Sequence, residues 1–271
     1  MTLVSTDWVE KNINNIKIID CSWHMPNVNR DGYKEYLEAH IQNAVFFDLD
    51  KNSDQMTDLP HMLTTSSDWE KIVSKMGISK DDEIVVYDNS DVLSSCRCWY
   101  NFIYFGHNDK LVHVLNGGLK KWKSEGKLTT NAIKEVSPTT YKISERENLV
   151  KNISQINKNI LSEEFKVIDA RSRERFEGKI PEPRKGLRSG NIKNSWCLPF
   201  NECLNDDKTF KNKKDLQVIF DAYIKDSQEI EIVFSCGSGV TACVLALAYS
   251  LINDKYRPCI YDGSWAEYGK I

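Results

Sequence analysis

The sequence predicts an α/β protein of two tandem domains, each an open, mainly parallel sheet flanked by helices. Three observations lead to this fold class. The chain has 271 residues. At about this length a single hydrophobic core stops growing and chains divide into domains. Its two halves share short motifs in the same order. Each half also alternates short apolar runs with helical patterns, as α/β units do. We therefore expect two cores.

The shared motifs form a weak tandem repeat. Ile18-Ile19-Asp20 in the first half matches Val167-Ile168-Asp169 in the second. Two further pairs follow in the same order, Ile84–Tyr87 with Ile230–Phe234 and Asn116–Leu119 with Tyr261–Trp265. The paired apolar runs are typical of buried parallel strands. Repeated order with small insertions indicates a duplicated domain.

A helical pattern precedes the central strand in both halves. In the first half we predict a helix over Ser67–Met76, begun by a capping box of Ser67 and Glu70 and ended by Gly77. In the second half Leu216, Ile219, Phe220 and Tyr223 have the same helical spacing. These elements predict domains over residues 1–125 and 151–271. The polar stretch 126–150, which contains Pro138, is the expected linker.

Composition favours a small-molecule substrate over nucleic acid or a membrane surface. The chain is 41% hydrophobic and 28% charged, and its net charge of -3 offers no basic surplus for nucleic acid or an anionic membrane. The first residues lack a secretory or transit pattern, and no apolar run is long enough to span a membrane. We expect a cytoplasmic protein. Its eight cysteines are expected to be reduced, and their spacing predicts no metal site.

The strongest chemical feature is the loop from Cys236 to Ala242, Cys-Gly-Ser-Gly-Val-Thr-Ala. It follows the predicted strand Ile230–Phe234 and precedes the helical stretch Cys243–Tyr249, so Cys236 lies where α/β proteins bind ligands. We expect the glycines to let the backbone curl and direct its N–H groups at the sulfur. Together with the helix N-terminus, they would favour a thiolate nucleophile. The other cysteines, including Cys243, are expected to be inert packing residues.

A cysteine-dependent phosphatase uses a similar loop but needs an arginine six positions after the cysteine. Ala242 occupies that position, and no basic residue lies between it and Cys236. Phosphate chemistry is therefore not expected.

The loop resembles that of the 3-mercaptopyruvate sulfurtransferases of the tandem-domain rhodanese superfamily. The resemblance covers nearly the whole chain. It implies two rhodanese-like domains, the second catalytic and the first a silent copy. The other motifs that carry it are Asp20–His24, Phe46–Asp50, His61–Leu63, Asp169–Arg171, Glu182–Arg184 and Tyr261–Trp265.

The resemblance also implies roles for particular residues. Cys236 would carry sulfur as a persulfide, and Ser238 would be paired with His61 and Asp50 of the first domain to manage protons. Thiosulfate-preferring relatives carry basic residues directly after the cysteine, where this chain has Gly237 and Ser238. The carboxylate of the donor would then be held by Arg175 and Arg184, with the loop residues Gly237, Gly239, Val240 and Thr241 completing the substrate site.

The chain departs from the family pattern in two places. Relatives often have His-Ile-Pro-Gly-Ala in each domain, where this chain has His40–Ala44 and Asn191–Ser195. The first domain also lacks a Cys-Gly-Ser-Gly loop, and Cys96 does not align with Cys236.

The expected function is sulfur transfer from 3-mercaptopyruvate to a thiol or cyanide, with release of pyruvate and no cofactor. The acceptor would be a small thiol or a thioredoxin-like protein. Two alternatives stay open, a thiosulfate sulfurtransferase and a non-catalytic persulfide carrier or redox sensor.

Overall fold

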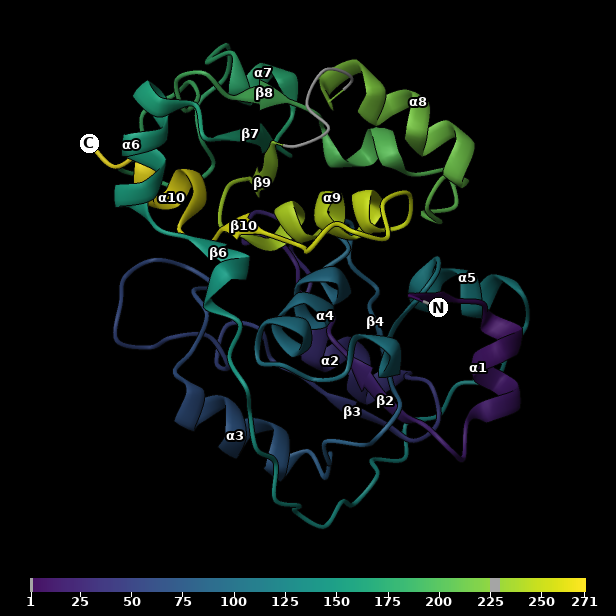
Figure 1. Ribbon diagram of the computed structural model, residues 1–271. Coiled ribbons are helices and arrows are strands. Elements are labelled where there is room, and N and C mark those ends of the chain that lie inside the picture. The colour runs from purple at the N-terminus through teal and green to yellow at the C-terminus, as the bar shows by residue number, and fades with distance from the viewer. Residues whose placement is uncertain (1, 225–229) are drawn as a thin grey trace. The chain divides into compact units, whose positions relative to one another are not determined.

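The computed structural model describes residues 2–224 and 230–271, which fall into two compact units. The first unit contains the chain up to Met56, then Leu63–Arg146 and Asp207–Thr209. The second contains Thr57–Met62, Glu147–Asp206 and Phe210–Ile271. Figure 1 shows both units as sheets flanked by helices. The predicted fold class, two tandem α/β domains, is confirmed.

The first unit is built on a parallel sheet of five strands in the order β1-β5-β4-β2-β3. Their apolar, β-branched sequences suit strands buried on both faces. The central strands β4 and β2 pair with Ile19 opposite Val86 and Asp20 opposite Tyr87. The strands are β1 Leu3–Val4, β2 Lys17–Asp20, β3 Ala44–Phe46, β4 Ile84–Tyr87 and β5 Val112–Leu115.

Helices cover both faces of this sheet. Val9, Tyr36 and Trp122, from three different helices, pack on one face with Ile18 and Val85. In another layer Trp69 stacks on the ring of Phe105 and meets that of Phe102 edge-on. The helices are α1 Thr6–Asn12, α2 Gly32–Glu38, α3 Ser66–Lys75, α4 Ser95–Tyr104 and α5 Gly118–Ser124, with a short 3-10 turn η1 at Asp109–Leu111.

The second unit repeats the same topology with a sheet in the order β6-β10-β9-β7-β8. Here β7 and β9 are central, and Asp169 pairs with Ser235. All its pairings are parallel. The strands are β6 Val150–Lys151, β7 Phe165–Asp169, β8 Trp196–Cys197, β9 Glu231–Ser235 and β10 Ile260–Tyr261.

Alternate residues of the second sheet face two different helix layers. Val167 and Val233 pack with Ile156 and Trp265, whereas Phe234 packs with aromatic residues of the opposite layer. Figure 1 shows the strands between α6 and α10 on one side and α8 and α9 on the other. The elements are η2 Glu147–Leu149, α6 Ile153–Ser162, α7 Arg173–Phe176, η3 Phe200–Cys203, α8 Lys213–Ile224, α9 Val240–Ser250 and α10 Ser264–Tyr268.

The predicted cap of the helix before β4 is wrong. Helix α3 is capped by Thr65, whose hydroxyl oxygen accepts a hydrogen bond from the Asp68 N–H, and not by Ser67. The Glu70 carboxylate instead accepts a hydrogen bond from the Ile143 N–H, in the segment that follows helix α5. Threonine and serine are nearly equivalent as N-caps, so the sequence pattern could not distinguish Thr65 from Ser67, and the predicted cap was two residues too late. The stop at Gly77 is confirmed by its φ of +68°.

The stretch predicted as a linker follows the surface of the first unit for most of its length. The backbone of Thr130 pairs with His40, and Thr139 N–H donates to the Ser74 carbonyl. Its last residue, Val150, already belongs to strand β6 of the second sheet, which spans Val150–Lys151. Within the part of the chain that the structure describes, no helix is both long enough and apolar enough to cross a membrane.

Candidate active site

Cys236 lies at the carboxyl end of the central strand β9, directly before a loop and helix α9. Its side chain is 2% exposed. Gly239 is the residue before the helix, and its φ of +75° is a left-handed conformation that a side chain would strain. The prediction that a glycine lets this loop curl is confirmed for Gly239. The first two helical residues are Val240 and Thr241, whose N–H groups have no acceptor within the helix.

Ser264 holds the two ends of this loop together. Its Oγ accepts hydrogen bonds from the N–H of Cys236 at 3.1 Å and of Gly239 at 3.2 Å, and it donates to the Tyr261 carbonyl. The expectation that successive loop N–H groups point at the sulfur is therefore wrong for these two. They are oriented towards the buried hydroxyl of Ser264, the first residue of helix α10. Ser264 itself has a φ of +49°, which is uncommon for a residue with a side chain.

Two arginines lie against Gly237. A Cβ built on this glycine would be 3.1 Å from Arg175 Nη2 and 3.7 Å from Arg184 Nη1. A side chain here would therefore crowd the Arg175 guanidinium group and force a shift of a few tenths of an ångström, so glycine suits this position. Arg175 comes from the short helix α7, and its side chain is 20% exposed. The structure thus brings both predicted arginines to the loop that carries Cys236.

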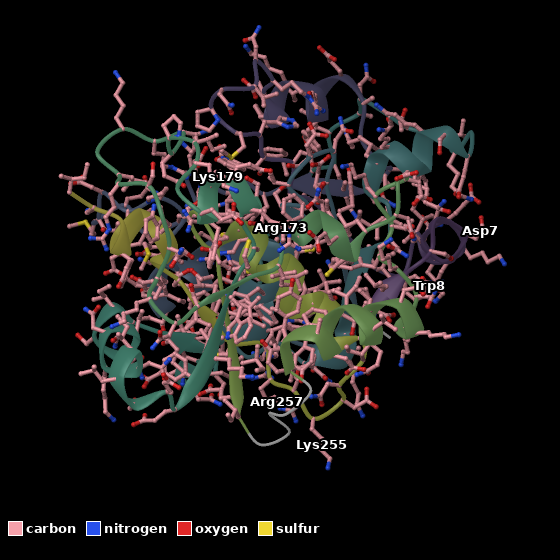
Figure 2. All side chains as sticks on the ribbon, turned by 90° about the horizontal axis from the view of Figure 1, so that it is seen from above. Asp7, Trp8, Arg173, Lys179, Lys255 and Arg257 are labelled. Carbon is pink, nitrogen blue, oxygen red and sulfur yellow. The ribbon has the colours of Figure 1, made fainter. Side chains whose placement is uncertain are left out.

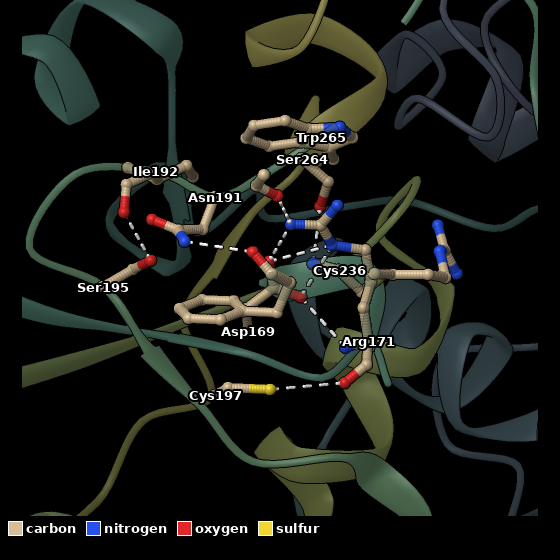
Figure 3. A network of polar contacts seen from close by, with 12 residues as sticks. Asp169, Arg171, Asn191, Ile192, Ser195, Cys197, Cys236, Ser264 and Trp265 are labelled. Carbon is tan, nitrogen blue, oxygen red and sulfur yellow. Dashed lines mark hydrogen bonds and ion pairs between the residues drawn. The ribbon is translucent and has the colours of Figure 1, made fainter. Parts of the chain in front are cut away.

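A buried ion network supports Arg175. Glu182 accepts from Arg175 Nη2 at 2.5 Å and from Arg171 Nη1 at 2.8 Å. Arg171 also donates to both carboxylate oxygens of Asp169, at the end of β7. Its guanidinium carbon lies 4.4 Å from the centre of the Trp265 ring, and Figure 3 shows Arg171 between this ring and Asp169.

His61 belongs to the second unit, in the segment Thr57–Met62. Its Nδ1 is 3.0 Å from the hydroxyl oxygen of Ser238, and both side chains are buried. His61 has a φ of +62°, so the loop holds it in a left-handed conformation. The structure therefore brings together two of the three residues that the resemblance grouped as a proton-handling set.

Asp50 belongs to the first unit. Its carboxylate accepts the indole N–H of Trp23, with N–O distances of 2.9 and 3.0 Å. Its action on His61 stays a prediction.

Burial disfavours the thiolate form of four of the other cysteines. Burial raises the pKa of Cys197 to about 12 and that of Cys203 to about 12. Burial likewise raises the pKa of Cys21 and Cys259. Cys243 is completely buried, and its sulfur lies 3.1 Å from the Gly239 carbonyl oxygen. Among residues 2–224 and 230–271, no three His, Cys, Asp or Glu side chains gather as a metal site would require.

The family model of the rhodanese-like domain matches the chain twice, over residues 5–125 and 152–270. The chain belongs to the rhodanese family. Both copies of this rhodanese fold therefore have a family match, and the second contains the Cys236 loop.

Relatives with named activities cover almost the whole rhodanese chain. The thiosulfate/3-mercaptopyruvate sulfurtransferase 1 of Arabidopsis thaliana, described as mitochondrial, is 39% identical over 98% of this chain and 75% of its own. The thiosulfate sulfurtransferase of Bos taurus is 36% identical over 98% of this chain and 91% of its own. SseA from Escherichia coli, described with the rhodanese fold and as a 3-mercaptopyruvate sulfotransferase, has a TM-score of 0.87 at 31% identity. That match covers 98% of this chain and 100% of SseA. This rhodanese is a sulfurtransferase enzyme.

The sequence did not predict a role for Ser264 or Glu182. Both lie in motifs that carry the family resemblance, Tyr261–Trp265 and Glu182–Arg184. Ser264 bonds residues 28 and 25 positions earlier, and Glu182 pairs with arginines 7 and 11 positions earlier. Only the fold shows what such residues touch.

Proposed function

We propose that this rhodanese transfers sulfur from 3-mercaptopyruvate, through a persulfide on Cys236, to a thiol or cyanide, and releases pyruvate. The observation that carries the proposal is the position of two guanidinium groups at an otherwise neutral loop. Arg175 Nη2 and Arg184 Nη1 both lie within 4 Å of the Cβ position at Gly237. A 2-keto carboxylate offers planar oxygens that match such donors.

In the first half-reaction the Cys236 thiolate attacks the sulfur of the donor. The bond between that sulfur and C3 breaks, and its electron pair becomes the enolate of pyruvate. Arg175 and Arg184 hold the carboxylate and keto oxygens, where negative charge develops. The proton of the donor thiol ends on C3, so that pyruvate leaves and Cys236 keeps a persulfide.

Ser238 and His61 would move that proton. Their hydrogen bond of 3.0 Å joins a hydroxyl to an imidazole, the only side chain whose ordinary pKa lies near neutrality. The hydroxyl can take the donor proton while passing its own, as in general acid–base catalysis. Asp50 would orient His61 in this scheme.

The persulfide anion would be stabilised by those loop N–H groups that Ser264 does not use. The Ser264 hydroxyl oxygen already accepts hydrogen bonds from the N–H groups of Cys236 and Gly239. We therefore assign this role to Gly237, Ser238, Val240 and Thr241, with the N-terminal dipole of α9 behind them. Gly239 would contribute through its left-handed backbone conformation, which lets the loop curl before helix α9.

In the second half-reaction a thiol or cyanide removes the outer sulfur and restores the thiolate. A small thiol or a thioredoxin-like protein would serve as acceptor, and ping-pong kinetics follow from the covalent intermediate. The cytoplasmic location stays a prediction, and the Arabidopsis relative is described as mitochondrial.

The second candidate is a thiosulfate sulfurtransferase, which the similarity to the Bos taurus enzyme favours. The test is kcat/KM for each donor with cyanide as the common acceptor. A higher value for mercaptopyruvate supports the proposal, and a higher value for thiosulfate contradicts it. Absence of turnover with both donors would leave a persulfide carrier as the better description.

A further inference from the structure

Glu182 is a buried carboxylate that none of the steps above uses. Its side chain is 1% exposed. It accepts three hydrogen bonds, from Arg171 Nη1 at 2.8 Å, Arg175 Nη2 at 2.5 Å and Arg175 Nε at 3.2 Å. A buried charge is stable only when paired and hydrogen-bonded in this way. Glu182 is thus fixed between two guanidinium groups.

The pairing continues on the far side of Arg171. Its Nη2 donates to Asp169 at 2.7 Å and to the Gly190 carbonyl at 2.8 Å, while the Trp265 ring covers one face of the guanidinium (Figure 3). Asp169, Arg171, Glu182 and Arg175 therefore form a continuous chain of two carboxylates and two guanidinium groups, which we call the ion chain. Within the ion chain the formal charges cancel.

The ion chain determines how Arg175 meets a substrate. Glu182 occupies the Nε and Nη2 edge of its guanidinium, which is the edge that usually binds a carboxylate side-on. The same Nη2 lies 3.1 Å from the Cβ position at Gly237. Arg175 therefore offers Nη1 and the second hydrogen of Nη2, from a fixed direction, and with its charge already balanced by Glu182.

We propose that Glu182 is a positioning residue that favours a monoanionic 2-keto acid over a dianionic donor such as thiosulfate. It does so by fixing the direction of Arg175 and by neutralising its charge. This inference rests on the proposed function, because it concerns the choice of donor at the same loop.

The test replaces Glu182 by glutamine, which keeps the shape and removes the charge. Glu182→Gln leaves the ion chain with one net positive charge and releases part of the Arg175 edge. We expect kcat/KM for thiosulfate to rise and that for mercaptopyruvate to fall, mainly through KM, because the extra charge favours the dianion. The ratio of the two values should shift towards thiosulfate by about tenfold or more.

Glu202→Gln is the matched control. Glu202 pairs with Arg173 at 2.7 and 2.9 Å, and Arg173 lies on the same helix α7 as Arg175. The side chains of this pair are 47% and 41% exposed, and Figure 2 labels Arg173. This substitution makes the same change of charge without touching Arg175. The donor ratio of Glu202→Gln should equal that of the unsubstituted enzyme.

A second variant separates direction from charge and serves if Glu182→Gln does not fold. Glu182→Asp keeps the charge but shortens the side chain by one methylene. We expect its KM for mercaptopyruvate to rise about threefold or more, with thiosulfate remaining the poorer donor. An unchanged KM would overturn the positioning role.

Different results would contradict the proposed donor and the proposed role of Glu182. An unsubstituted enzyme that prefers thiosulfate overturns both the proposed donor and the role of Glu182. An enzyme that prefers mercaptopyruvate, with an unchanged donor ratio in folded Glu182→Gln, overturns only the role of Glu182. Folding is checked by thermal unfolding and near-ultraviolet circular dichroism of each variant.

Discussion

The two sheets of this rhodanese have the same strand order, but different residues stand at the end of their central strands. Asp20 pairs with Tyr87 in the first sheet, and Asp169 pairs with Ser235 in the second. The residue that follows is Asp88 in one unit and Cys236 in the other. By strand register, Asp88 and not Cys96 is therefore the counterpart of Cys236.

The backbone around the two positions is alike. The Asp88 carbonyl accepts the Leu119 N–H at 2.8 Å, and the Cys236 carbonyl accepts the Trp265 N–H at 3.0 Å. The residues before these donors, Gly118 and Ser264, both have positive φ, +57° and +49°. The duplication has kept the loop framework in both units.

The side chains use this framework in opposite ways. The Asp88 carboxyl group accepts the N–H of Ser90 and of Ser95, each at 2.8 Å, so the first unit's loop already holds a carboxyl group of its own. In the second unit Ser264 takes two loop N–H groups, and a thiol stands where the carboxylate would be. A buried carboxyl group in place of the thiol would account for the predicted catalytic silence of the first domain better than the mere lack of a cysteine would.

The largest expected effect is at the position that distinguishes the two loops. Cys236→Ser removes the sulfur nucleophile, so pyruvate release from mercaptopyruvate should fall by about a thousandfold or more. Cys197→Ser is the control, because burial keeps the Cys197 thiol protonated with a pKa of about 12. Steady-state assays of both variants measure this. Turnover of Cys236→Ser at the rate of the control would refute the nucleophile.

The hydroxyl next to Cys236 should have a smaller effect. Ser238→Ala removes the partner of His61 Nδ1, and we expect kcat with mercaptopyruvate to fall about 100-fold, the lower end of what general acid–base groups contribute. The control is Ser250→Ala, at the far end of helix α9.

A double-mutant cycle with His61→Asn tests whether the pair acts as a unit. Asparagine tolerates the left-handed φ of His61. Losses that multiply in the double variant would show that Ser238 and His61 act separately.

In the first unit the corresponding substitution should affect stability and not chemistry. Asp88→Ala leaves two buried N–H groups without acceptors, which should lower the free energy of unfolding by about 2 to 4 kcal/mol. Asp91→Ala in the same loop is the control, because the Asp91 side chain is 74% exposed. Chemical denaturation of both variants gives the comparison. Equal stabilities would show that the Asp88 carboxylate does not hold its loop.

The last comparison concerns the pH dependence of stability and the equivalent residues Asp20 and Asp169. Arg171 neutralises Asp169, whereas Ser22 stands at the equivalent place beside Asp20. Burial raises the pKa of Asp20 to about 6. A raised carboxyl pKa contributes stability that is fully present below the unfolded value near 3.8 and is lost as pH rises through about 6.

Asp20→Asn does not titrate and should lack this loss. Between pH 4 and pH 7.5 the unsubstituted protein should lose up to about 3 kcal/mol of unfolding free energy more than Asp20→Asn does. Denaturation across this pH range measures the difference. Parallel pH profiles would contradict a raised pKa at Asp20.

The sequence was enough to predict the fold class, because buried parallel strands produce apolar runs such as Ile84–Tyr87 that repeat in both halves. It also indicated the Cys236 loop, where two glycines follow a strand. It could not predict the cap of α3, since Thr65 and Ser67 are chemically equivalent candidates.

The role of Ser264 and the ion chain at Glu182 were beyond the sequence for a different reason. Ser264 bonds residues 25 and 28 positions earlier in the chain. Glu182 contacts arginines only 7 and 11 positions away, but no periodic pattern of the sequence reveals such a pairing. The same holds for Asp88, which only the pairing of β2 with β4 aligns with Cys236.

The central claim is that Cys236, and no other cysteine, carries the transferred sulfur. Its most direct test is the intact mass of the protein after treatment with mercaptopyruvate, followed by peptide mapping. We predict one added sulfur atom, located on Cys236 and removed by cyanide. Sulfur on any other cysteine, or pyruvate release with no sulfur retained on Cys236, would contradict the account.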